Sequence, residues 1–288
     1  MAKPMVVVLL MGLMQAQAYA ASPAARWTLD GIEKGQISEA GGLFNGRVHG
    51  ELKQADGVVG KSLVFDGATA LVTVPAAPDL SIGEGPFTLA AWACPYALGN
   101  GQQMIAAKNH YTANQREWGL MIDRDDRIRF YAHVGGWKTL ASKTQPKPGV
   151  WHHVAVTFEN GRARLYVNGI IEGEETLGAS VAATSAPFSL GGVHNGGNPM
   201  QQFQGALDEV SVWRAALSAE AMAELANKKP APHKVPEIVK PVTLWSGGEL
   251  PKSSEIPQAA DVEIHTIKAY EPTVDGYQIG RASCRERV

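Results

Sequence analysis

The chain has 288 residues, of which 45% are hydrophobic and 19% charged, so its composition is that of a globular protein large enough for a full core. Its formal net charge of -2 gives no electrostatic reason to expect nucleic acid or an anionic membrane surface as a partner.

Residues 1–20 have the pattern of an export signal. Lys3 supplies a positive charge, residues 5–14 form an apolar run, and Ala18-Tyr19-Ala20 is a small-x-small cleavage site. The apolar run is too short to cross a bilayer, and no later segment is long enough. A buried N-terminal helix is the alternative. We therefore expect a secreted or periplasmic protein without a membrane span.

Short strands separated by turns follow. Residues 26–31 open with a strand, and the glycine-rich passage 41–60 predicts turns. Residues 62–67 alternate and end in Asp66-Gly67, a turn pair, before another short strand at 70–74.

The middle of the chain continues this pattern. Residues 87–95 predict a strand in which Trp92 lies on the supposedly outer face, so we expect both faces to be partly covered. Strands at 104–108 and 118–122 flank a polar loop at 110–117, and the period of two in 127–133 predicts a half-buried strand.

Residues 151–169 predict a β-hairpin around Asn160-Gly161, the pair that most readily adopts a type I′ turn. A two-residue loop fixes the register, which places Phe158 opposite Ala163, Val156 opposite Leu165 and Val154 opposite Val167. The resulting apolar face requires a second sheet to cover it.

The last part of this region closes the sheet. A strand at 188–192 leads into a Gly/Asn-rich loop at 193–202, a closing strand at 203–213, and a short helix capped by Ser218 that ends near Asn227. Short, regularly spaced strands favour an all-β antiparallel sandwich over any α/β arrangement.

Four motifs, GKSLVFDG (60–67), FTLAAWACP (87–95), the hairpin and FQGALDEVSVWRAALSAEAM (203–222), together resemble the laminin-G-like, concanavalin A-like jelly-roll domain of many secreted bacterial proteins. The resemblance covers residues 26–227 and implies a jelly-roll β-sandwich with a short C-terminal helix. It does not fix a ligand, because one fold hosts many functions.

Beyond residue 227 the composition changes. Residues 228–242 mix proline with lysine, which is typical of an extended linker. We expect residues 243–278 to begin a second, truncated domain, and they weakly resemble the lead-in to a sialidase-like propeller. Residues 279–288 match a translated sequencing adapter, so we exclude them and Cys284. Cys94 then remains as a buried strand cysteine.

The resemblance also implies a possible calcium ion at one rim, held by carboxylates and carbonyls. Asp66 and Asp208 occupy the motif positions that commonly face each other in such domains. The alternative is that Asp66 starts a turn and Asp208 only accepts backbone N–H groups.

Catalytic patterns are weak. A glycosidase-type acid pair on one strand face has its only candidate in residues 172–175, which read as a solvated edge. The eight histidines show no metal-ligand spacing, and neither a nucleophile elbow nor a phosphate loop is present in the sequence.

Binding is the remaining chemistry. Sugar recognition uses an aromatic platform with polar groups beside it. We predict a ligand site formed by Trp118, Tyr131 and Trp137, with His133 nearby and His194 and Asn195 in a facing loop. The alternative is that tryptophans fill the core, which we favour for Trp92, Trp151 and Trp213.

We therefore predict a non-catalytic, exported carbohydrate-binding module with a glycan or polysaccharide as partner and a further C-terminal domain. The alternatives are the N-terminal part of a secreted, sialidase-like glycoside hydrolase, or a structural or adhesion module that binds protein.

Overall fold

The computed structural model describes residues 22–196, 198–230, 233 and 235, which form an antiparallel jelly-roll β-sandwich, as predicted. All strands and the single α-helix of this part lie between Ala25 and Ala226. The predicted signal segment, the second domain at 243–278 and the adapter tail lie outside the described residues, as does most of the linker.

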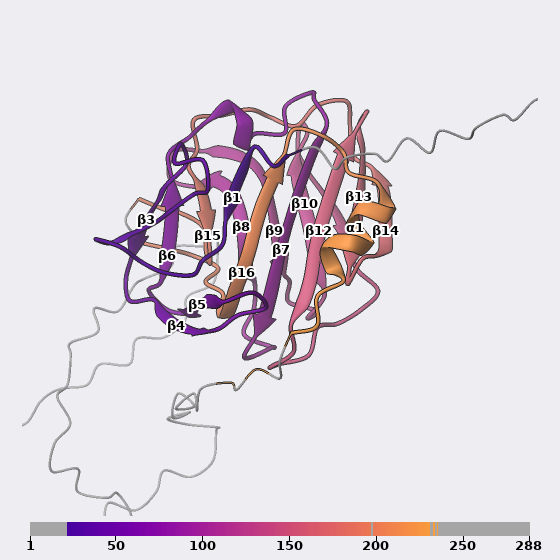
Figure 1. Cartoon of the computed structure of the whole chain (residues 1–288). Helices are drawn as coiled ribbons and strands as arrows, with labels where there is room; N and C mark the ends of the chain where they lie inside the picture. Colours follow the sequence, from indigo (N-terminus) through magenta and orange to yellow (C-terminus); the bar gives the residue numbers. More distant parts are fainter. Residues whose placement is uncertain (1–21, 197, 231–232, 234, 236–288) are drawn as a thin grey trace, which may run out of the picture. The chain divides into compact units, whose positions relative to one another are not determined.

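The first sheet has eight strands, and its central strands lie in front in Figure 1. Its order is β14 (Ile170–Thr176), β13 (Arg162–Val167), β12 (His152–Glu159), β7 (Phe87–Pro95), β16 (Gln204–Trp213), β5 (Lys61–Asp66) and β4 (Lys53–Asp56), and β1 (Ala25–Trp27) also pairs with β16.

The second sheet also has eight strands and forms the other layer. Its order is β11 (Trp137–Ala141), β10 (Ile128–His133), β9 (Gln115–Ile122), β8 (Gln103–His110), β15 (Phe188–Leu190), β6 (Leu71–Val74), β3 (Gly46–His49) and β2 (Gln36–Ile37). A 3₁₀ turn at Pro78–Leu80 follows β6.

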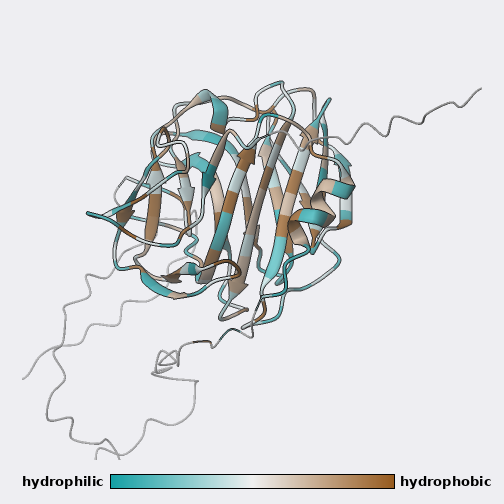
Figure 2. Ribbon diagram, viewed as in Figure 1, coloured by the Kyte–Doolittle hydropathy of each residue, from teal (hydrophilic) through white to brown (hydrophobic). Residues whose placement is uncertain are grey.

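The predicted hairpin is confirmed in its register. Phe158 lies opposite Ala163 and Val154 opposite Val167, and Asn160 and Gly161 both have positive φ, 50° and 79°. Figure 2 shows apolar and polar residues interspersed along the strands of this layer. The apolar side chains of the hairpin enter the core between the sheets.

The outer face of the first sheet is covered in part by α1 (Ala219–Ala226), which lies across it in Figure 1. Met222 of the helix packs with Ala155, Tyr166 and Trp213. The Ser218 hydroxyl accepts a hydrogen bond from the Ala221 N–H at 3.3 Å, so the predicted cap is confirmed. This eight-residue helix is too short to cross a membrane, and the described residues contain no helix that could do so.

Two local expectations were wrong. The passage 41–60, expected as turns, contains the short strands β3 and β4, and the loop expected at 110–117 is only a turn at 111–114 between β8 and β9. β3 and β4 contain glycine and polar residues and lack an apolar alternation. Their formation therefore depends on pairing with neighbouring strands and is not predicted by the sequence pattern.

Candidate functional site

The outer face of the second sheet carries a shallow groove of about 490 Å³, which we call the Trp137 groove. Six residues line it: Tyr111, Thr112, Arg116, Trp137, Asn195 and Met200. They come from the turn between β8 and β9, from the start of β9 and β11, and from the loop that follows β15. The groove therefore combines two of the five predicted ligand residues with four that were not predicted.

Trp137 is the exposed aromatic side chain of the groove. It begins β11 directly after Gly135-Gly136, and 40% of its surface is accessible. The edge contacts of its ring go to Tyr131, with centroids 4.6 Å apart, and to His133, at 5.2 Å. One part of the indole is thus packed while another part stays available for a ligand.

Tyr131 packs against the Trp137 ring and is itself buried. Its hydroxyl accepts a hydrogen bond from Asn109 Nδ2 at 2.7 Å, and burial raises the pKa of Tyr131 well above its ordinary value. Asn109 is fixed in turn, because it donates to the Trp118 carbonyl and accepts from the Glu117 N–H. Tyr131 therefore positions the platform but does not line the groove.

Trp118 was wrongly expected at the ligand site. It pairs with Ala132 in the register of β9 and β10, which places its side chain in the core. There its ring packs against Phe87 and Phe188, with centroids 5.4 and 5.8 Å away. The alternative that a tryptophan fills the core is the right one for Trp118, and Trp92, Trp151 and Trp213 are buried as well.

His194 and Asn195 behave differently from each other. His194 packs edge-on against His110 at 4.7 Å and does not line the groove, and burial lowers its pKa, with further lowering by His110 and His49. Asn195 does line it, and its Oδ1 accepts a hydrogen bond from the Thr112 N–H at 3.1 Å. This bond ties the loop after β15 to the turn between β8 and β9.

Four groove residues were not predicted from the sequence, and they lie in two segments whose residues indicated only a polar loop or turns. Tyr111 begins the turn at 111–114 and Arg116 follows it, and the Arg116 Cζ lies 5.6 Å from the Tyr111 ring centroid. An aromatic and a basic residue close together at one turn, Tyr111 and Arg116, is the pattern that could have indicated this site.

A second, amide-rich pocket of about 390 Å³ adjoins the groove, since both are lined by Met200. The Tyr111 hydroxyl donates to Gln201 Oε1 at 3.2 Å, and Gln201 Nε2 donates to Gln102 Oε1 at 2.6 Å. The two hollows are thus joined by one chain of hydrogen bonds.

The predicted calcium pair needs correction, because the structure separates its members. Asp66 lies opposite Gln204 on β16, four residues from Asp208, which corresponds to about 13 Å along the strand. An ion cannot touch both carboxylates at that separation. In the described part of the chain, no cluster of three or more His, Cys, Asp or Glu side chains suits a metal ion.

Each aspartate accepts hydrogen bonds from backbone N–H groups, although Asp208 Oδ1 has no donor among the described residues. Asp66 Oδ1 accepts from the N–H groups of Ala68, Thr69 and Ala70 at 2.8–2.9 Å. Buried Asp208 accepts from the N–H groups of Val58 and Val59 at 2.7 and 3.0 Å. These are the roles expected for the two aspartates if they do not bind calcium. Calcium at this rim stays a prediction, and the ion must then be held by other oxygen ligands.

The acidic segment 172–175 lies on the edge strand β14. Glu174 forms ion pairs with Arg162 and Arg164, and Glu172 accepts hydrogen bonds from the Lys143 and Thr144 N–H groups. Both carboxylates thus serve contacts within the sandwich.

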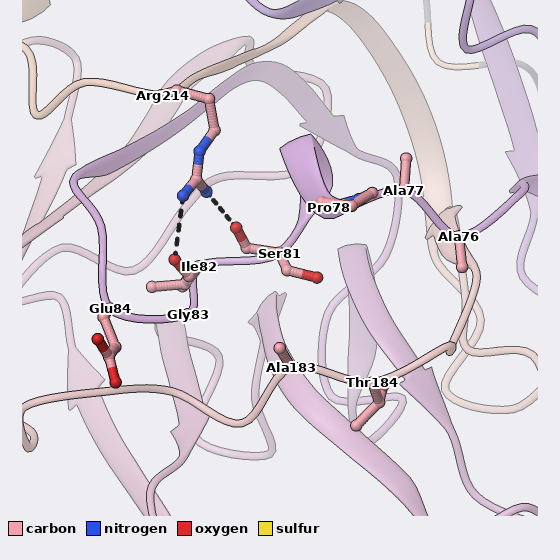
Figure 3. Close-up of a pocket in the computed structure, with 10 residues that line it drawn as sticks. All are labelled: Ala76, Ala77, Pro78, Ser81, Ile82, Gly83, Glu84, Ala183, Thr184 and Arg214. Carbon is pink, nitrogen blue, oxygen red and sulfur yellow. Dashed lines mark hydrogen bonds between the residues drawn. The ribbon is translucent and has the colours of Figure 1, made fainter.

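A further pocket of about 420 Å³ lies beside the 3₁₀ turn, and Figure 3 shows its lining. There the Arg214 guanidinium donates to the carbonyls of Ser81 and Ile82. The lining is otherwise mostly aliphatic and includes no aromatic side chain. Because its arginine is already engaged, this pocket suits a sugar less well than the Trp137 groove.

Residues 66–223, more than half of the chain, match the model of the laminin G family within the concanavalin A-like lectin/glucanases superfamily. The chain belongs to this superfamily. The chain is also 26% identical over 107 residues to the rat protein "Sushi, von Willebrand factor type A, EGF and pentraxin domain-containing protein 1". That match takes in 34% of this chain and only 3% of the rat protein.

Several solved structures share the concanavalin A-like fold. Domain 4 of AbnA, an extracellular arabinanase from Geobacillus stearothermophilus solved with arabinotriose, is 22% identical with a TM-score of 0.56, covering 71% of this chain and 98% of that one. The binding domain of Paraclostridial Mosquitocidal Protein 1 is 15% identical with a TM-score of 0.57, covering 70% and 51%. Trypanosoma rangeli sialidase is 16% identical with a TM-score of 0.56, covering 70% and 32%.

Proposed function

We propose that this domain is an exported, non-catalytic carbohydrate-binding module that binds glycan in the Trp137 groove. The observation that carries the proposal is the half-exposed Trp137 ring, held by Tyr131 and flanked by Asn195, Thr112 and Arg116. A sugar ring stacks its C–H face on such an indole while hydroxyl groups bond to amides and charges beside it. The arabinotriose bound by the similar arabinanase domain supports this reading.

We further propose that the module is joined through the Pro/Lys-rich linker to a C-terminal enzyme domain. A bound module raises the effective concentration of an attached enzyme at a polymeric substrate. The sialidase neighbour, in which a similar domain covers 32% of that chain, favours a glycoside hydrolase as the partner domain. A structural or adhesion module that binds protein is the competing function.

The test is glycan-array binding followed by titration of the best ligand. Trp137→Ala should lower affinity by about tenfold or more, since stacked aromatic anchors dominate such interfaces, and should leave the melting temperature unchanged. Ile170→Ala, which trims an exposed apolar side chain on the other sheet, is the matched control and should bind normally. Absence of any glycan ligand, or full binding by the Trp137 variant, would favour the protein-binding alternative.

A further inference from the structure

Arg116 is the charged member of the groove. It pairs with Asn109 in the register of β8 and β9, and the Asn109 side chain reaches Tyr131 on the outer face of the second sheet. The Arg116 guanidinium lies over the Tyr111 ring, with Cζ 5.6 Å from its centroid. This contact holds the cation at the groove without neutralising it.

The donors of Arg116 are unused within the described residues. Its buried Nε has no hydrogen-bond acceptor there, and its guanidinium forms no ion pair with them. Arg129 on the neighbouring strand β10 has carboxylate partners, as do Arg162 and Arg164 on β13 of the first sheet. A cation left without an acceptor beside an exposed aromatic ring is suited to an anion brought by the ligand.

The surroundings do not supply that anion. No carboxylate lines the groove, and Glu117, the neighbour of Arg116 in sequence, is buried in an ion pair with Lys108 at 2.7 Å. Asn195 and Thr112 add neutral polar groups at the other side of the groove. Arg116 therefore gives the groove a net positive charge.

We propose that the Trp137 groove selects sugars that carry a carboxylate, with Arg116 binding that carboxylate and Trp137 stacking on the same or the adjoining ring. This inference rests on the proposed function and names its ligand class. The planar guanidinium matches a carboxylate through two parallel N–H···O bonds, which a hydroxymethyl group cannot accept in the same way.

The experiment uses matched probes in titration calorimetry of the full chain. Polygalacturonate, alginate and hyaluronate are each compared with their own carboxyl-reduced form, and sialyllactose is compared with lactose. We expect at least one acidic probe to bind about tenfold or more tightly than its neutral partner, as a charge-assisted bidentate contact implies. That preference should weaken as salt is raised.

Three variants separate the causes. Arg116→Gln should remove the preference for the acidic probe and leave the neutral probe unaffected, and Arg116→Lys should restore part of it. Arg127→Gln makes the same change in net charge at an exposed site outside the groove and should behave like the wild type.

The possible failures are distinguishable. If the wild type binds neutral probes through Trp137 and shows no preference for any acidic one, the charge selection is wrong while the binding function stands. If Arg127→Gln lowers acidic binding as much as Arg116→Gln does, the effect is general charge attraction and the role of Arg116 is wrong. If no probe of either kind binds, and a glycan array also shows none, the proposed function itself fails.

Discussion

The ring of Tyr131 lies directly over the backbone of Gly119, its cross-strand partner, so closely that a Cβ at position 119 would stand 2.6 Å from the ring. A glycine in a strand interior usually marks such a close approach. Here the missing side chain gives Tyr131 the space from which it supports Trp137.

Gly119→Ala should therefore lower both stability and glycan affinity. Forcing a methyl group into this contact should cost about 1–3 kcal/mol of unfolding free energy, measured by urea denaturation, and should displace the ring under Trp137. Gly136→Ala is the control, because a Cβ at that position meets nothing within 4 Å and Gly136 is just as near to Trp137 in sequence. Equal effects of the two substitutions would contradict a specific role for the Gly119–Tyr131 contact.

Asp208 should make stability fall as pH rises. Burial raises its pKa to about 6, although hydrogen bonds from Val59 and Val58 oppose that shift. Because the folded-state pKa lies above the ordinary value of 3.8, the folded chain binds more protons between pH 4 and pH 6, and the associated stability is lost through that range. Asp208→Asn removes the titration, and its amide oxygen can still accept from Val58 and Val59.

Urea unfolding at pH 4 and pH 7 measures this effect. Relative to the Asn variant, the wild type should lose about 2 kcal/mol between these pH values, because each tenfold difference in proton affinity between the folded and unfolded chain corresponds to about 1.4 kcal/mol and the unfolded carboxyl is already more than half ionised at pH 4. A constant difference between the two proteins would show that Asp208 has an ordinary pKa.

His153 should act in the opposite direction. It lies across Trp92 from Asp208, with its ring edge-on to Trp92 at 5.3 Å, and burial lowers its pKa to about 4, with a smaller effect from Lys228. The folded chain then binds fewer protons than the unfolded chain between pH 4 and pH 6.5, so this contribution to stability grows as pH rises.

His153→Phe keeps an aromatic ring against Trp92 and removes the titration. We expect the stability of His153→Phe to fall from pH 4 to pH 7, because Asp208 still titrates in this variant. The Asp208→Asn variant should become more stable over the same range, because His153 still titrates in it. The wild type should be flatter than either variant, because the two contributions cancel in part. The same urea measurements check this, and parallel pH profiles for all three proteins would contradict it.

Asp66 is expected to stabilise a turn. Burial alone would raise the pKa of Asp66, but hydrogen bonds from residues 68–70 hold it below its ordinary value. Because three N–H groups point at one of its oxygens, we expect a loss of about 1–2 kcal/mol in Asp66→Ala, and we expect CaCl₂ to change the melting temperature of Asp66→Asn as much as that of the wild type. A rise in melting temperature with calcium that disappears in Asp66→Asn would restore Asp66 as a calcium ligand.

The sequence predicted the hairpin in detail because Asn160-Gly161 fixes its register locally. The face of Trp118 was not predictable in this way. β9 and β10 are joined by residues 123–127, and an interruption in the pairing of β8 with β9 falls just beside Trp118. A shift of one residue moves every side chain to the other face, so the parity of Trp118 against Tyr131 depended on this longer connection.

The same reasoning explains the groove. Trp137 and Asn195 were identified by residue type, but Tyr111, Arg116 and Met200 reach the groove because a turn and a distant loop meet over the sheet. The local sequence pattern does not predict which turns and loops lie next to each other in the fold. Cys94 was easier, since a strand cysteine between apolar neighbours is expected to be buried, and its pKa is raised by burial to about 12.

The groove residues stand on a sheet whose opposite face is already filled by the core, and four of them belong to connections and not to strands: Tyr111, Thr112, Asn195 and Met200. Residues at such places can be exchanged without repacking the interior. Substitutions in these connections can therefore change the chemistry that the groove presents while the scaffold stays constant, and a designer who wants a new specificity can begin with the turn at 111–114.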